Sequence, residues 1–160
     1  MCAMKPTPPG WPRISAALFY SDPKKAIDWL GRAFGFEVRL LVEGAGGRVE
    51  HSELEYGDGL IMVGGVGPGY EKHGQAWRQR IASPGMVGGR STANLAVHID
   101  DADAHCARAR EAGAEIFYEP QTTDYGEGYW ADRSYGAFDL EGHAWWFMQR
   151  VSTSQKQHGR

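Results

Sequence analysis

The stretch SDPKKAIDWLGRAFGFEVRL, residues 21–40, returns in altered form as DDADAHCARAREAGAEIFYE, residues 100–119. Each copy begins with an acidic cap and an amphipathic helix, and continues through a glycine stop into a strand. The caps Asp22 and Asp101 are separated by nearly the same number of positions as the stops Gly35 and Gly113. An internal repeat of this length predicts two copies of one structural module.

The composition narrows the class of protein. Hydrophobic residues make up 42% of the 160 residues and charged residues 23%, which is typical of an ordinary globular protein with one domain or two tightly packed half-domains. The net charge of −3 gives no basic face for nucleic acid. No apolar run approaches the roughly 18 residues that span a membrane, and the first residues lack the apolar core of a secretory signal. With two cysteines, the sequence predicts a cytoplasmic protein that binds neither membranes nor nucleic acid.

Periodicity and turn residues predict the order β-α-β-β-β twice. In the first copy Asp22 caps a helix with Pro23 at its first position. The expected strands are residues 13–21, 36–42, 48–56 and 60–63, then 94–99, 115–119, 129–138 and 144–148. We expect a first module at 12–66, a connector at 67–91 and a second module at 92–150. The connector is expected to be a functional or mobile loop, or to contain a short helix at 75–81. Residues 1–11 and 152–160 are expected to be tails.

Four motifs in order carry a resemblance to a known family. They are a strand ending in SDP before a helix, the glycine-stopped FGF, the hairpin EYGDGLIMV, and the closing YGAFDLEGHAWWFMQ. Over about residues 12–150 the chain resembles the glyoxalase/bleomycin-resistance/dioxygenase superfamily, which has the vicinal oxygen chelate fold. The resemblance implies an α+β fold of two βαβββ modules whose curved mixed sheets enclose a cavity for a small molecule. It also implies a homodimer.

Metal-using members of that family take four ligands, usually His or Gln, Glu, His and Glu, from the first and last strands of each module. The matching positions here are Ser15, Val63, Asn94 and Trp146. Shifting the alignment by one residue brings in Met62 or Gly64 and Trp145 or Phe147, which are no better as ligands. A divalent metal needs imidazole, thiolate or carboxylate donors. We therefore expect no metal and no other cofactor.

Polar candidates lie on two of the expected strands. His51, Glu53 and Glu55 alternate and share one strand face, which either lines the cavity or is a solvated outer face. His98 shares a face with Asn94, which the resemblance turns inward; the alternative is a structural histidine at the strand end.

Aromatic residues gather near the C-terminal hairpin. By alternation Trp146 faces the cavity with Met148, whereas Trp145 and Phe147 face a helix. Trp146 supplies a stacking surface, or alternatively fills the space of a lost metal site. The expected ligand contacts are Phe19, His51, Glu53, Asn94, His98, Trp130, Arg133, Tyr135, Trp146 and Met148.

The leading hypothesis is a metal-independent protein, similar to the bleomycin-resistance branch, that sequesters an aromatic or amphiphilic compound and confers antibiotic resistance by binding. The alternative is a glyoxalase-like enzyme of the lyase, isomerase or dioxygenase type. It would use His51 and Glu53 as an atypical metal site or as an acid/base pair. A third reading is a filled module that serves protein association.

Overall fold

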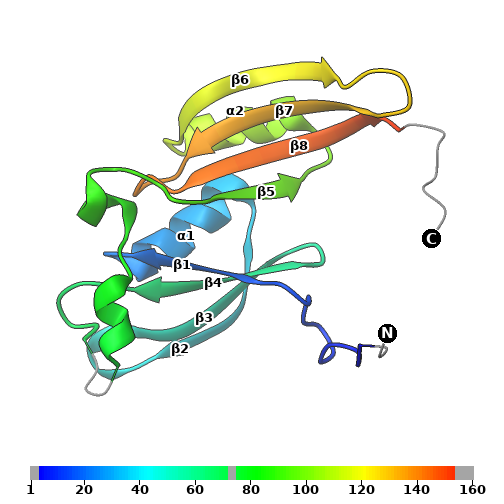
Figure 1. Ribbon diagram of the computed structural model, residues 1–160. Helices are drawn as coiled ribbons and strands as arrows, with labels where there is room; N and C mark the ends of the chain where they lie inside the picture. The colour runs from blue at the N-terminus through cyan, green and yellow to red at the C-terminus, as the bar shows by residue number, and fades with distance from the viewer. Residues whose placement is uncertain (1–3, 72–74, 154–160) are drawn as a thin grey trace. The chain divides into compact units, whose positions relative to one another are not determined.

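The computed structural model describes residues 4–71 and 75–153, and it has an α+β fold with two βαβββ modules (Figure 1). The first module consists of β1 Ala16–Tyr20, α1 Pro23–Phe34, β2 Glu37–Glu43, β3 Val49–Tyr56 and β4 Gly59–Gly65. The second consists of β5 Asn94–His98, α2 Ala102–Glu111, β6 Glu115–Asp124, β7 Ala131–Phe138 and β8 Ala144–Ser152. The fold class inferred from the repeat is thus confirmed.

The two sheets have the same topology. Their strand orders are β1-β4-β3-β2 and β5-β8-β7-β6, and in each the first strand runs parallel to its neighbour while the other pairs are antiparallel. Each sheet is therefore mixed. The parallel pair arises because the helix connection reverses the chain before the meander of three strands.

The helix ends follow the expected signals. The Asp22 carboxylate accepts a hydrogen bond from the Lys25 amide at 3.0 Å, and Asp101 accepts one from the Ala104 amide at 2.9 Å. Gly35 ends α1 with φ of 83°, a left-handed conformation that glycine adopts without the steric cost of a Cβ.

Contacts divide the chain into two compact units. One runs to Gly31 and from Gly35 to Ser83, and the other contains Arg32–Phe34 and the chain from Pro84 onward. The module boundaries given above, 12–66, 67–91 and 92–150, stay a prediction.

The first unit has a buried core built from one face of its sheet and from α1. Leu54, Ile61 and Val63 are at most 5% exposed, and Ala26 and Leu30 of α1 are fully buried. Strand alternation places Phe19 and Met62 on the opposite face of the sheet, called the open face below, where both are half-buried.

In the second unit α2 packs on one face of its sheet. Trp145, Phe147 and Tyr135 are fully buried on this face, and the ring of His105 from α2 lies 4.5 Å from that of Phe147, centroid to centroid. The other face carries Trp146, which is half-buried. The alternation of the three consecutive aromatic residues therefore decides which of them belongs to the core.

Two strands of the second sheet are longer than the sequence indicates. β6 continues to Asp124 and β8 to Ser152, since Thr122 pairs with Arg133 and Asp132 with Arg150. Pro120 lies within β6, at an irregularity between Tyr118 and Gln121. Proline is tolerated there because β6 is an edge strand.

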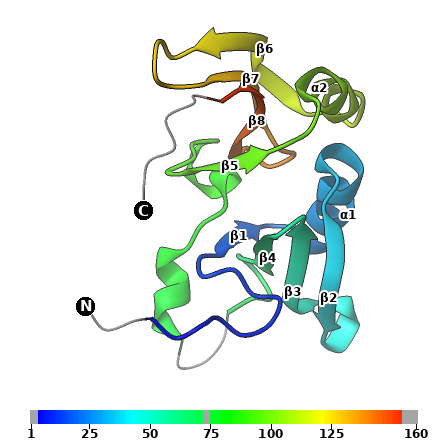
Figure 2. The ribbon, with the colours of Figure 1, turned by 90° about the vertical axis from the view of Figure 1, so that its right-hand side faces the viewer.

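Of the alternatives for the connector, the structure has the short helix, as a 3₁₀ turn at Ala76–Arg80, and it adds a second turn at Pro84–Val87. The N-terminal segment runs past the first sheet before entering β1 (dark blue, Figure 2), and Trp11 is half-buried. The parts of the expected tails at 1–3 and 154–160 lie outside the described residues.

Candidate functional site

On the open face of the first sheet, β1 and β4 leave space for an aromatic ring. Phe19 pairs with Gly64, and a Cβ built on Gly64 would lie 3.0 Å from the Phe19 ring. The ring therefore lies across the glycine backbone. Met62 occupies the same face two residues earlier.

Three charged or titratable side chains meet beside this face. Oε1 of Glu53 lies 2.9 Å from Nε2 of His51, and its Oε2 lies 3.1 Å from Nε of Arg39. The Glu53 side chain is 7% exposed, whereas that of His51 is 42% exposed. A buried carboxylate is thus held between a guanidinium and an imidazole that solvent reaches.

The position of Arg39 has a backbone cause. The pairing of β2 with β3 shifts register between Val38 and Leu40, so Arg39 is the extra residue of a β-bulge. A bulge interrupts strict alternation and redirects a side chain. This lets Arg39 reach Glu53 although its neighbours in β2, Val38 and Leu40, are apolar.

Arg39 also binds the N-terminal segment. Its Nη1 donates to the carbonyl oxygen of Gly10, and its guanidinium lies 5.1 Å from the centroid of the Trp11 ring. A pocket of about 490 Å³ lies beside these contacts, lined by residues 7–12, Arg39, Glu55 and residues 57–60. Part of the expected N-terminal tail is therefore one wall of a pocket.

On the open face of the second sheet an aromatic cluster surrounds Trp146. The rings of Phe117 and Tyr118 meet the indole edge-on at centroid distances of 5.4 and 5.0 Å, and Phe138 lies 4.7 Å from Phe117. Gly136 pairs with Trp146, and a Cβ on Gly136 would lie 2.3 Å from the Phe117 ring. The cluster needs a glycine at this position.

Polar candidates neighbour the cluster on the same face. Asn94, Ala96 and His98 of β5 pair with Ala144, Trp146 and Met148 of β8. Asn94 and His98 are exposed, so they can offer hydrogen bonds to a molecule that stacks on Trp146.

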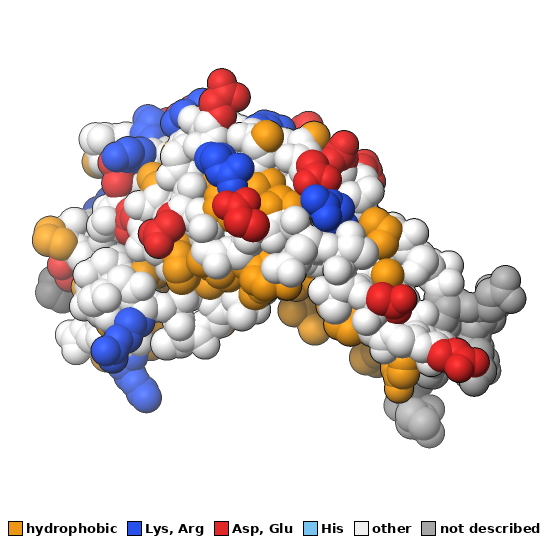
Figure 3. Space-filling model, turned by 90° about the horizontal axis from the view of Figure 1, so that it is seen from above, with side chains coloured by type: hydrophobic (Ala, Val, Ile, Leu, Met, Phe, Trp, Pro, Cys, Tyr) orange, Lys and Arg blue, Asp and Glu red, His pale blue; other side chains and the backbone are white. Residues whose placement is uncertain are grey.

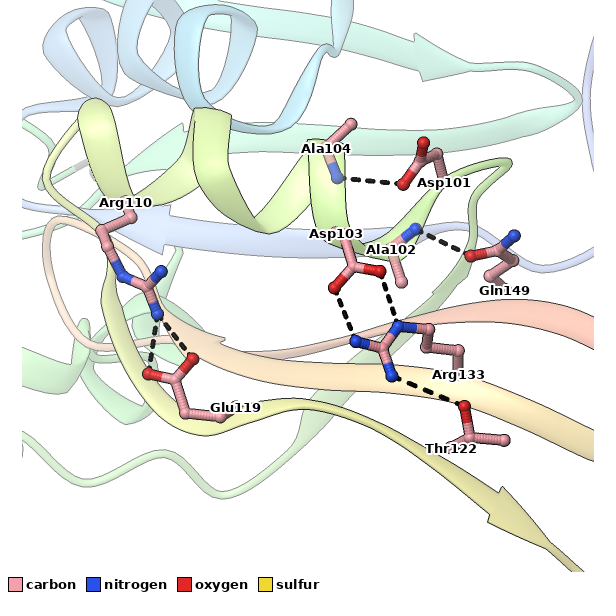
Figure 4. A network of polar contacts seen from close by, with 9 residues as sticks. All are labelled: Asp101, Ala102, Asp103, Ala104, Arg110, Glu119, Thr122, Arg133 and Gln149. Atoms are coloured by element: carbon pink, nitrogen blue, oxygen red, sulfur yellow. Dashed lines mark hydrogen bonds and ion pairs between the residues drawn. The ribbon is translucent and has the colours of Figure 1, made fainter.

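Two expected ligand contacts lie on the other face of this sheet. Arg133 pairs with Gln149, and Tyr135 with Phe147, which places both beneath α2. Arg133 forms a bidentate ion pair with Asp103, with both N–O distances 2.7 Å, and the pair lowers the pKa of Asp103 (Figure 4). The Tyr135 hydroxyl lies 2.5 Å from Nδ1 of His105. We leave both residues out of the candidate site because their polar groups join α2 to the sheet.

Trp130 lies beyond the cluster, next to β7. Its indole N–H donates to Asp132 at 3.0 Å, and the Arg150 guanidinium lies 4.7 Å from its ring centroid while Nε of Arg150 donates to Asp132 at 2.5 Å. The Trp130 indole is thus fixed by its neighbours, although the residue is 39% exposed.

The side chains at the family's metal-ligand positions do not fit a divalent ion. Val63 is 1% exposed and lies on the buried face, and its neighbours on the open face of β4 are Met62 and Gly64, which offer no imidazole, thiolate or carboxylate donor. Trp146 supplies an indole. Within residues 4–71 and 75–153, no group of three or more His, Cys, Asp or Glu side chains is placed to hold a metal ion.

Two surface properties bear on possible partners. On the face drawn in Figure 3, acidic and basic side chains stand next to one another, unlike the single-sign surface of a nucleic-acid binder. Among the described residues no helix combines the length and apolarity that a membrane span requires.

Sequence reasoning missed Arg39, Trp11, Phe117 and Tyr118. The bulge that turns Arg39 toward Glu53 depends on strand register, which a single sequence does not reveal. Phe117 and Tyr118 gave a clearer signal, since they are adjacent aromatic residues on a strand next to the one that pairs with Trp146.

Comparison with known proteins identifies the family. Residues 14–147 match the model of the Glyoxalase/Bleomycin resistance protein/Dioxygenase superfamily. Among solved structures, TioX from Micromonospora sp. ML1 is 33% identical, with 86% of this chain and 95% of that chain covered and a TM-score of 0.62.

Two further structures share the fold. TnmS3, an antibiotic binding protein from Streptomyces sp. CB03234, is 21% identical over 86% of this chain and 93% of its own, with a TM-score of 0.56. The fosfomycin resistance protein FosX from Mesorhizobium loti is 16% identical over 85% and 89%, with a TM-score of 0.53. No curated protein matches the chain. The family model and the TioX match together show that the chain belongs to the glyoxalase/bleomycin-resistance/dioxygenase superfamily.

Proposed function

We propose that this protein binds a small aromatic or amphiphilic molecule without a metal ion, as a member of the bleomycin-resistance-like branch of its superfamily. The observation that carries the proposal is Trp146, a half-buried indole on the open face of the second sheet. Its edge-on contacts with Phe117 and Tyr118 hold the ring in place. A ring that is already fixed loses little side-chain entropy when a planar ligand stacks on it.

The open face that carries Trp146 also provides polar side chains for the ligand. Asn94 and His98 are the hydrogen-bonding side chains beside Trp146, and Met148 adds a polarizable apolar contact. On the first sheet Phe19, His51 and Glu53 are the matching candidates on its own open face. TnmS3, described as an antibiotic binding protein, supports this class of function, and we extend it to this chain as a proposal.

The experiment measures binding of 9-aminoacridine, anthraquinone-2-sulfonate and 1-anilinonaphthalene-8-sulfonate by isothermal titration. We expect at least one to bind, and Trp146→Ala to weaken it by at least about tenfold, the loss expected for a well-stacked ring together with its buried area. Trp77→Ala is the matched control, because Trp77 is 51% exposed on the connector. Equal binding by wild type and Trp146→Ala, or no binding of any of the three, overturns the proposal.

A catalytic role is the second candidate, and the contact of His51 with Glu53 favours it. An exposed imidazole backed by a buried carboxylate is the arrangement of an oriented general base. After loading with nickel or zinc and dialysis, stoichiometric retention of metal that is lost in His51→Ala would contradict the metal-independent function. The homodimer and the cytoplasmic location stay predictions, the first of which light scattering in solution tests directly.

A further inference from the structure

The pocket beside the N-terminal segment is a second place where this chain can hold a small molecule. Its volume of about 490 Å³ falls within the range of small-molecule sites, roughly 300–1,000 Å³. Arg39 is the one lining residue that also contacts the His51–Glu53 pair, and none of the lining residues is assigned to the Trp146 face. The inference below therefore does not depend on the proposed function.

One wall of the pocket is short but well held. Residues 7–12 contain three prolines, whose rings fix φ. The Trp11 amide donates to the Pro8 carbonyl at 3.0 Å, which closes a turn. Arg39 binds this wall through the Gly10 carbonyl and the Trp11 ring. The wall is thus ordered by contacts with the sheet.

The facing wall is the hairpin between β3 and β4. Glu55 and Leu60 pair across it, so their side chains share one face, and the turn between them carries Asp58. Leu60 is 5% exposed. This wall therefore combines a largely buried leucine with two carboxylates, one from the strand and one from the turn.

The charge around the pocket is unbalanced. The positive charge of Arg39 is matched by Glu53, whose Oε2 lies 3.1 Å from Nε. Glu55 and Asp58 form no ion pair with any of the described residues. Two carboxylates without partners beside an indole and a leucine favour a ligand with a positive charge and an apolar body.

We propose that this pocket binds a small organic cation, with an ammonium group near Glu55 and Asp58 and an apolar body against Trp11 and Leu60. Coulomb attraction to the carboxylates selects the charge. Proline rings, the indole and the leucine side chain accept the apolar part.

The test uses the full chain and three molecules of similar shape. 3-Phenylpropylamine is the cation, 3-phenylpropanol the neutral analogue and 4-phenylbutyrate the anion. Binding is followed by two-dimensional NMR through the indole N–H of Trp11 and the amides of residues 57–60. We expect the amine to bind at least tenfold more tightly than the alcohol, and more weakly at high salt, because charges near the surface are screened.

The matched variants remove charge and keep shape. We expect the double variant Glu55→Gln/Asp58→Asn to bind the amine about tenfold more weakly and to bind the alcohol with unchanged affinity. Glu111→Gln combined with Glu115→Gln, both at exposed positions of the second unit, is the control for the loss of two charges. Equal affinity for amine and alcohol, an unaffected double variant, or larger shifts of the same amides with calcium than with the amine would each overturn the proposal. Trp146→Ala is expected to leave amine binding unchanged, which separates this site from the proposed function.

Discussion

The Nε atom of Arg39 lies 3.1 Å from Oε2 of Glu53, whose side chain is 7% exposed. The second oxygen of the same carboxylate is 2.9 Å from Nε2 of His51. A buried carboxylate requires a charge partner, because removal from water costs several kcal/mol. Arg39 is that partner, and it also contacts Gly10 and Trp11. The same guanidinium therefore balances the charge of Glu53 and holds the N-terminal segment against the sheet.

Replacing Arg39 tests this dependence. Arg39→Met leaves Glu53 buried with His51 alone, and we expect the free energy of unfolding to fall by about 2–3 kcal/mol, below the full loss for a buried pair because Arg39 is one-quarter exposed. Urea denaturation measures the change. Arg80→Met, an exposed substitution in the connector, is the control. The double variant Arg39→Met/Glu53→Leu is expected to recover much of the loss, and a double variant as unstable as Arg39→Met would contradict the account.

We expect the protonation of His105 to contribute to the pH dependence of stability. Burial lowers the pKa of His105 below its ordinary value of 6.5, and Arg108 adds a smaller effect in the same direction, opposed by the hydrogen bond to the Phe34 carbonyl. The folded protein therefore keeps the ring neutral where the unfolded chain would bind a proton. Its contribution to stability is complete above 6.5 and is lost as the pH falls below that value.

We expect a lower free energy of unfolding near pH 5 than near pH 7.5, and a flatter profile in His105→Asn. His98→Gln, at an exposed position, is the control and should keep the wild-type slope. An identical slope in the His105 variant would show that other groups cause the pH dependence.

Cys106 is expected to be chemically inert in the native state. Burial raises the pKa of its thiol above 9.0, and the residue is 1% exposed. In a Cys2→Ser background we expect labelling by a disulfide reagent to be at least about a hundredfold slower in buffer than in denaturant, since reaction must wait for local opening. Rapid stoichiometric labelling of the folded protein would refute this.

The neighbouring tryptophans of β8 should differ in their effect on stability. Trp145 is fully buried and donates its indole N–H to Asp139 at 3.1 Å. We therefore expect Trp145→Ala to lower the free energy of unfolding by about 3–5 kcal/mol. Trp146→Ala removes a half-buried ring from the open face and should lose clearly less. Chemical denaturation of the two variants decides the matter, and equal losses would mean that Trp146 belongs to a core.

The features readable from the sequence are the ones that local chemistry determines. Asp22 and Asp101 cap their helices through their own side chains, and alternation alone separates Trp146 from Trp145. The sequence groups Arg133 and Tyr135 with the ligand contacts, whereas the pairing of β7 with β8 puts them on the face of Trp145. A single sequence does not reveal that pairing. Arg39 was missed for a related reason, since its direction follows from a bulge created by strand pairing.

Residues 7–12 form a pocket wall at the edge of the family fold, where sequence change affects binding more than folding. The match to the family model begins at residue 14, so the Pro-rich wall lies ahead of the matched residues. Substitutions in residues 7–12 would change which molecules the pocket binds and leave the strands and helices unaltered. A new selectivity would then arise at the margin of the domain, where sequence drifts at the lowest risk to folding.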